Sequence, residues 1–142
     1  MRNFEIKPGI GVGPIMLGME RSEVEINFGQ PEHENGSKVG YFSGFMISYS
    51  ESNKVEFIEL ANSESFTATF EGKDLHNIPA EKALEFVCNY DSYDENEPEL
   101  GYSYTFKKLQ LSLWRGAMPE SENDREGKSF EAVGIGEANY FV

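Results

Sequence analysis

Short apolar runs separated by polar, glycine-rich turns set the pattern of this chain, and two of the runs have the spacing of a helix. Val24 and Phe28 are four positions apart and share one helical face, while Gly29 and Pro31 end that segment. A second apolar stripe begins after Pro79, which suits the first turn of a helix. The pattern therefore predicts helices over residues 21–28 and about 79–90.

Alternating apolar and polar positions predict β-strands around these helices. In the run that contains Phe66, Ala68 and Phe70, every second side chain is apolar, which places these three on one face of a sheet. A Lys107-Lys108 turn between two alternating runs indicates a β-hairpin. The predicted strands cover residues 41–49, 55–60, 66–70, 102–106, 109–114 and 130–135.

The order of these elements suggests that the chain contains one module twice. Each half has a short helix followed by strand-like runs, so we place repeat units at about residues 8–61 and 66–136. We expect an α+β fold in which two copies of a helix plus an antiparallel β-meander share one curved sheet, with the helices packed on one face. Because no linker separates the copies, residues 1–142 are expected to form a single domain.

The charge of the chain narrows the classes of partner. Its 142 residues carry a net charge of −13 at pH 7, which opposes binding to nucleic acid or to an anionic membrane. Cys88 is the single cysteine, which fits a reducing compartment, and its place on the second apolar stripe predicts a buried thiol. With no signal-peptide pattern and no membrane-spanning run, we expect a cytoplasmic protein.

No catalytic motif is legible in the chain. A Gly-x-Gly-x-Gly run at residues 9–13 is followed by Pro14 and not by a helix, which argues against a phosphate-binding turn. The two histidines, His33 and His76, lie in predicted loops and lack metal-ligand spacing. No serine stands in a Gly-x-Ser-x-Gly frame. We therefore expect neither an enzyme nor a bound metal or cofactor.

Two acidic segments of the second half carry the functional prediction. In a helix-then-meander unit, the loop after the helix and the turn before the last strand lie at the same end. This brings residues 91–99 and 117–128 together and puts the Lys107-Lys108 turn at the opposite end. The alternatives are solvated loops without a partner and a divalent-cation site. The predicted partner-binding residues, with Tyr93 as an aromatic anchor, are Asp91, Tyr93, Asp94, Glu95, Glu97, Glu99, Glu120, Glu122 and Asp124.

The first half also resembles a known family. Residues 13–19 read Gly-Pro-Ile-Met-Leu-Gly-Met and are followed by Glu23-Val24, Phe28-Gly29 and Pro31. Over about residues 10–60 this pattern is similar to the small α+β modules of the BamE/SmpA type. The two-copy form resembles bacterial cytoplasmic proteins that include immunity proteins of polymorphic and contact-dependent toxin systems. The resemblance implies an immunity function.

Charge and resemblance together favour a non-enzymatic protein-binding function. Nuclease toxins are basic because they hold phosphates, so an acidic immunity protein can cover the same surface and be steered to it by charge. We expect a basic protein partner, no nucleic acid and no membrane, with the oligomeric state left open. The alternatives are a small-molecule-binding or enzymatic domain with a pocket between the two repeats, and an envelope-associated interaction module.

Overall fold

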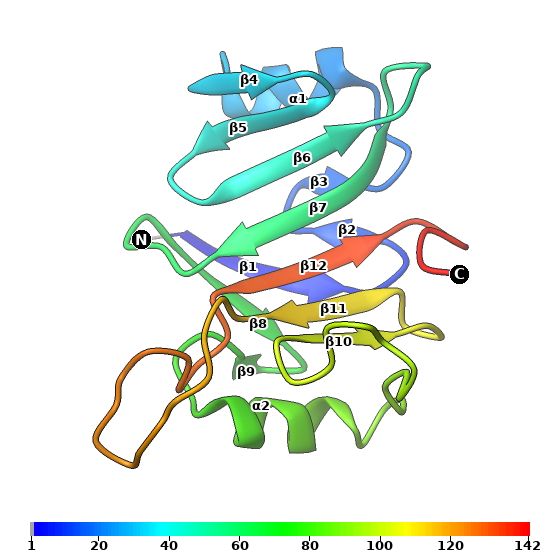
Figure 1. Cartoon of the computed structure of the whole chain (residues 1–142). Coiled ribbons are helices and arrows are strands. Elements are labelled where there is room, and N and C mark those ends of the chain that lie inside the picture. The colour runs from blue at the N-terminus through cyan, green and yellow to red at the C-terminus, as the bar shows by residue number, and fades with distance from the viewer. Residues whose placement is uncertain (1) are drawn as a thin grey trace.

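A computed structural model describes residues 2–142, which form two β-sheets and two helices (Figure 1). The large sheet has seven strands in the order β10-β11-β12-β7-β6-β5-β4, and all of its neighbouring strands are antiparallel. These strands are β4 (His33–Asn35), β5 (Lys38–Phe42), β6 (Phe45–Tyr49), β7 (Val55–Ala61), β10 (Ser103–Phe106), β11 (Leu111–Trp114) and β12 (Ala132–Gly136).

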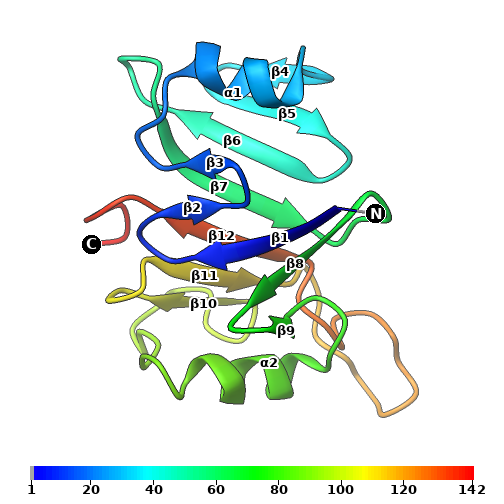
Figure 2. The ribbon, with the colours of Figure 1, turned by 180° about the vertical axis from the view of Figure 1, so that it is seen from behind.

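The small sheet has five strands in the order β3-β2-β1-β8-β9 and contains a parallel pair, β1 and β8. It lies against one face of the large sheet, with the helices α1 (Arg21–Phe28) and α2 (Ala80–Val87) at its two ends (Figure 2). The small sheet and the helices therefore cover one face of the large sheet together. The strands of the small sheet are β1 (Arg2–Lys7), β2 (Gly11–Val12), β3 (Ile15–Met16), β8 (Phe66–Phe70) and β9 (Lys73–Asp74).

The prediction of an α+β fold built from two helix-plus-meander copies is wrong. Strands make up 38% of the structure and helices 11%, and the strands form two sheets instead of one curved sheet. The units predicted at 8–61 and 66–136 also separate strands that belong together, because β1 precedes the first unit and pairs with β8 of the second. A sequence pattern shows which side of a strand is apolar but not which strand lies beside it.

The core lies between the sheets and is built from alternating side chains. In β6, Phe45, Ile47 and Tyr49 are buried while Met46 and Ser48 are half-buried. Rings from α1 and both sheets meet in this layer, where edge-to-face and tilted contacts hold the layers together. Neighbouring ring centroids lie between 4.8 and 6.3 Å apart in the cluster of Phe4, Phe28, Phe42, Phe45 and Phe66.

The first helix agrees with its prediction, and the second is shorter than predicted. α1 covers Arg21–Phe28, and Gly29 follows it with a positive φ of 78°, a conformation that glycine adopts without strain. α2 ends at Val87, before the predicted end at residue 90. Cys88 is the residue that caps this end of the helix, and it is exposed, so the prediction of a buried thiol is wrong.

Candidate functional site

The first acidic segment, residues 91–99, holds the turn between β10 and β11. Asp91 accepts hydrogen bonds at Oδ2 from the backbone N–H groups of Lys108 and the residue after it, at 3.0 and 3.2 Å. Lys107 forms an ion pair with Asp94 at 3.2 Å. The predicted position of the Lys107-Lys108 turn, opposite the acidic segments, is therefore wrong, because the chain turns back along β10 after it leaves α2.

Asp94 and Glu97 attach this segment to β10 itself. The N–H of Asp94 donates to the carbonyl of Thr105 (2.9 Å), and Glu97 Oε2 accepts from the hydroxyl of Thr105 (3.3 Å). Asp94 Oδ1 accepts from the N–H of Asn96 at 3.0 Å. That hydrogen bond and the Lys107 ion pair lower the pKa of Asp94. These two carboxylates therefore stabilise the position of the segment on the edge of the sheet.

Tyr93, the predicted aromatic anchor, takes part in packing. Its ring lies edge-to-face against Tyr104, with centroids 5.0 Å apart, and against Phe106 at 6.1 Å. The side chain is half-buried and packs against the core between the sheets. Tyr93 is therefore one of the residues that fix the first acidic segment to the body of the molecule.

The second acidic segment, residues 117–128, lies in the loop that joins β11 to β12 and projects from the body of the molecule, orange in Figure 1. Asp124 organises it by accepting hydrogen bonds from the N–H groups of Glu120 (3.1 Å) and Glu126 (3.0 Å). These hydrogen bonds, that from Glu120 first, lower the pKa of Asp124. Asp124 is thus a structural residue of the loop.

Two basic side chains hold the projecting loop. Arg115 donates from Nε to the carbonyl of Gly101 and from Nη1 to the carbonyl of Gly127, both at 2.8 Å. The ammonium of Lys128 donates to the carbonyl of Glu122. The Gly101 hydrogen bond also joins the chain just after the first acidic segment to the base of the loop. The two segments therefore approach each other here, and not along a common pole.

The nine predicted residues divide into two groups by burial. Five are half-buried and hold local structure: Asp91, Tyr93, Asp94, Glu97 and Asp124. Four are exposed, and within residues 2–142 their carboxylates make no hydrogen bond or ion pair: Glu95, Glu99, Glu120 and Glu122. We call these four the free carboxylates. They are the predicted residues whose acceptor oxygens are available to another molecule.

A groove of about 630 Å³ separates α2 from the projecting loop, and we call it the α2 groove. Its volume lies in the range of about 300–1,000 Å³ that is usual for ligand sites. The groove lies beside one helix and not between the two predicted repeats. Its apolar surface comes from Leu84, Tyr104, Met118 and Phe130, and its acidic side chains are Glu81, Glu120 and Glu122.

The basic and the acidic side chains of the α2 groove differ in the hydrogen bonds that they make within the molecule. Its two basic side chains, Arg115 and Lys128, donate to carbonyls of the loop and its surroundings. Glu81 is exposed, and its carboxylate, like the two free carboxylates in the groove, makes no hydrogen bond or ion pair within residues 2–142. The groove therefore offers acceptors more than donors. Glu81 and Leu84 were not among the predicted site residues, although their i, i+3 spacing near the start of the helix places them on one face.

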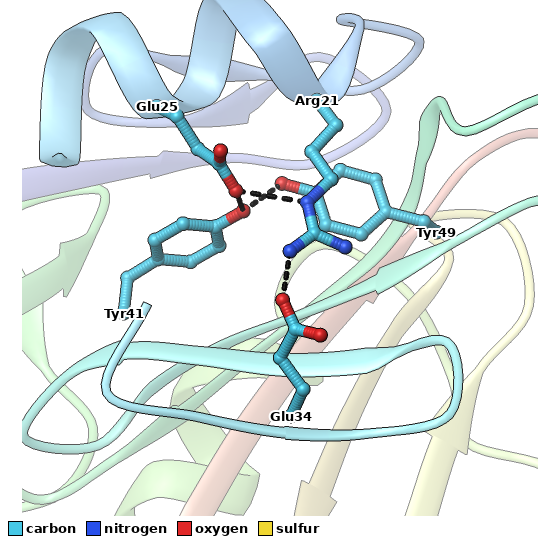
Figure 3. Close-up of polar contacts among 5 residues, drawn as sticks. All are labelled: Arg21, Glu25, Glu34, Tyr41 and Tyr49. Atoms are coloured by element: carbon cyan, nitrogen blue, oxygen red, sulfur yellow. Dashed lines mark hydrogen bonds and ion pairs between the residues drawn. The ribbon is translucent and has the colours of Figure 1, made fainter. Parts of the chain in front are cut away.

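A separate cluster of titratable groups lies between α1 and the large sheet (Figure 3). Arg21 donates from Nε to Glu25 at 2.8 Å, and a second nitrogen of the guanidinium contacts Glu34 of β4. The hydroxyl of Tyr41 donates to Glu25 at 2.9 Å and lies 2.6 Å from the hydroxyl of Tyr49. Because an ionised carboxylate only accepts, Tyr41 donates to Glu25 and Tyr49 donates to Tyr41.

The protonation states of the side chains in this cluster follow from their contacts and burial. The hydrogen bond from Arg21 lowers the pKa of Glu25, so that carboxyl is ionised at neutral pH. Burial raises the pKa of Tyr41 and of Tyr49, so both phenols keep their protons. Since these side chains bind one another, the cluster fastens α1 to β4, β5 and β6. We assign it a structural role.

His76 is buried and serves the fold. Its Nε2 donates to the carbonyl of Leu60 at 2.8 Å, and burial lowers the pKa of the imidazole, so the ring is neutral at pH 7. Asp74 accepts from the backbone N–H of His76 and not from its ring. Within residues 2–142, no group of three or more His, Cys, Asp and Glu side chains is placed to hold a metal ion.

Comparison with known proteins adds no relative to this geometry. None of the helices within residues 2–142 is both long and apolar enough to cross a membrane. No family model, no curated protein and no solved structure matches the chain. The resemblance to BamE/SmpA-type modules stays a prediction.

Proposed function

We propose that this protein is a non-enzymatic binding protein for a basic protein partner, and that it is an immunity protein that covers the phosphate-holding surface of a nuclease-type toxin. The observation that supports the proposal is the division of the predicted acids into structural and free carboxylates. A carboxylate that accepts hydrogen bonds from its own backbone is occupied, whereas Glu95, Glu99, Glu120 and Glu122 are exposed and unoccupied within residues 2–142.

Long-range charge supports the same proposal. The net charge of −13 attracts a basic partner from a distance and raises the rate of encounter, with an effect that salt weakens. A single exposed ion pair contributes little, about 0–1 kcal/mol. The free carboxylates therefore act as a group, and their number matters more than any one of them.

The test measures binding by isothermal titration calorimetry to the protein that the immediately upstream gene encodes. The test variant neutralises the free carboxylates through the substitutions Glu95→Gln, Glu99→Gln, Glu120→Gln and Glu122→Gln. The control variant removes the same charge from exposed glutamates outside the groove, through Glu23→Gln, Glu51→Gln, Glu64→Gln and Glu71→Gln. Both variants keep the groups that hold the fold.

The proposal predicts that the test variant binds at least about tenfold more weakly, a loss of about 1.4 kcal/mol. The control variant loses much less, because its carboxylates lie outside the interface and act only through long-range charge. Equal losses in the two variants would show that only total charge matters. Unchanged binding in both, or no binding by the unsubstituted protein, would refute the proposal.

A further inference from the structure

The α2 groove combines an apolar surface with acidic side chains along its length. Leu84 from α2 and Met118 from the projecting loop line it together with Tyr104 and Phe130. Met118 is 43% exposed, so a large apolar side chain faces water at this place. Specific interfaces have such an anatomy, with an apolar centre inside a polar rim.

The hydrogen-bonding groups of the α2 groove favour a positively charged ligand. The carboxylates of Glu81, Glu120 and Glu122 have no partner among residues 2–142, whereas Arg115 and Lys128 donate to backbone carbonyls. A ligand with ammonium or guanidinium groups therefore gains charge-assisted hydrogen bonds. A phosphate or a carboxylate meets three negative charges. Of its natural donors, the guanidinium of Arg115 is held by two carbonyls and the sulfur of Met118, and the ammonium of Lys128 already donates to one carbonyl.

We infer that the α2 groove receives a short segment of a basic protein, in which one large apolar side chain is flanked by lysine or arginine. The apolar side chain packs between Leu84 and Met118, and the flanking cations bind Glu81, Glu120 and Glu122. This inference rests on the proposed function, because it names the part of the basic partner that enters the site.

The arrangement of the groove favours a protein segment over a compact small molecule. One wall is helix α2 and the other is the projecting loop, two elements that lie beside each other at one end of the molecule (Figure 2). Exposed side chains from both walls, such as Glu81 and Met118, line the groove, so it is open to solvent. An apolar anchor in such a groove dominates binding, while the charged rim fixes register and rejects wrong partners. A second copy of this chain is disfavoured as occupant, because each copy carries a charge of −13.

The test begins with a displayed library of short random peptides selected against the intact protein. We expect the selected peptides to carry an aromatic or aliphatic residue flanked by lysine or arginine. Their position is then mapped by NMR of the methionine methyl groups. Met118 reports on the groove, and Met16, which is 50% exposed on β3, is a matched reporter outside it.

Binding of a selected peptide is expected to shift the methyl resonance of Met118 and not that of Met16. Met118→Ser removes the 3.5 Å contact of the sulfur with Arg115 but keeps the two carbonyl hydrogen bonds of Arg115 that hold the loop, and it leaves the core intact. It is expected to weaken peptide binding about tenfold. Met16→Ser is the matched control and leaves binding unchanged. Ser121→Trp, which fills the groove from the loop side without removing any packing, is expected to block the peptide.

Several results would overturn the inference. One is the selection of acidic peptides, or of basic peptides without an apolar residue. Another is a peptide that shifts the resonance of Met16 or binds equally well to the Met118→Ser and Ser121→Trp variants. Self-association that shifts the Met118 resonance and disappears in Ser121→Trp would assign the groove to a second copy of the chain.

The failure of this inference is distinguishable from the failure of the proposed function. Suppose that the upstream partner binds Ser121→Trp normally but binds the Gln-substituted free carboxylates weakly. The basic partner is then real, and the groove is not where it inserts. If the partner binds both variants normally, the proposed function fails as well.

Discussion

Asp91 and Glu95 lie four residues apart in the same acidic segment, yet of these two only Asp91 accepts hydrogen bonds from the backbone of residues 2–142. We expect Asp91→Ala to lower the free energy of unfolding by about 1–2 kcal/mol, because two N–H groups of the β10–β11 turn lose a charged acceptor. Glu95→Gln is expected to change stability by less than about 0.5 kcal/mol. Denaturant unfolding of the two variants measures the difference, and equal stabilities would contradict this division of the acids.

The lowered pKa of Glu25 predicts that the free energy of unfolding depends on pH through this residue. Its folded-state pKa is lowered below the ordinary value of 4.5, so its charge stabilises the folded protein above that value. This stabilisation is lost as the pH falls through the lower, folded-state pKa. Glu25→Gln keeps an acceptor for Tyr41 but removes the charge, so its stability deficit should shrink as the pH is lowered.

The measurement compares the unfolding free energies of the wild-type protein and Glu25→Gln in urea across a range of pH. The gap between them is expected to be constant near neutrality and to narrow below about pH 4.5. A gap that stays constant down to about pH 3 would mean that the ion pair with Arg21 does not stabilise the folded state.

At the scale of elements, local patterns located several segments well. The apolar spacing of Val24 and Phe28, with Gly29 behind them, placed α1 at residues 21–28, and the alternation of Phe66, Ala68 and Phe70 placed β8. These patterns report a period and a stop signal, which are properties of neighbouring residues. They were sufficient for elements whose burial is regular.

The pairing of strands could not be predicted from such local patterns. The parallel contact of β1 with β8 joins residues more than sixty positions apart, such as Phe4 and Ala68, and no local pattern encodes it. The roles of Asp91 and Asp94 were missed for a related reason. Their composition marks them as acidic loop residues, but their partners on the β10–β11 turn depend on the path of the chain after α2.

The projecting loop is an element whose position depends on Arg115. Its guanidinium joins the carbonyls of Gly101 and Gly127, which close the base of the loop. We expect Arg115→Gln to leave the fold intact and to raise the rate of tryptic cleavage after Arg125 and Lys128 about tenfold. Lys82→Gln, on the exposed face of α2, is the control.

Limited proteolysis followed by mass spectrometry identifies the cut sites in this experiment. Cleavage of Arg115→Gln at the wild-type rate would show that the loop does not need the two carbonyl contacts. Cleavage throughout the core would show that Arg115 supports the whole fold and not the loop alone. Either result would weaken the assignment of the loop as a defined wall of the α2 groove.

At the scale of the whole molecule, the acidic residues outnumber the basic ones by 25 to 12. The described residues form five ion pairs. Arg21 makes two of them, and Lys38 makes a third with Glu59 on the large sheet. Most of the negative charge is therefore uncompensated by ion pairs. We assign the part of it carried by the free carboxylates and Glu81 to recognition of a basic partner.

The most direct test of this assignment is the association rate constant with the upstream partner, measured by stopped flow from about 50 to about 500 mM NaCl. For the wild-type protein we predict a fast rate that falls steeply with salt. The Glu23, Glu51, Glu64 and Glu71 control variant has lost charge only outside the interface, so we predict a slightly slower rate with a similarly steep fall. For the variant without the free carboxylates, we predict a markedly slower rate with a much shallower salt dependence. The same rate and the same salt dependence in all three proteins would contradict this assignment.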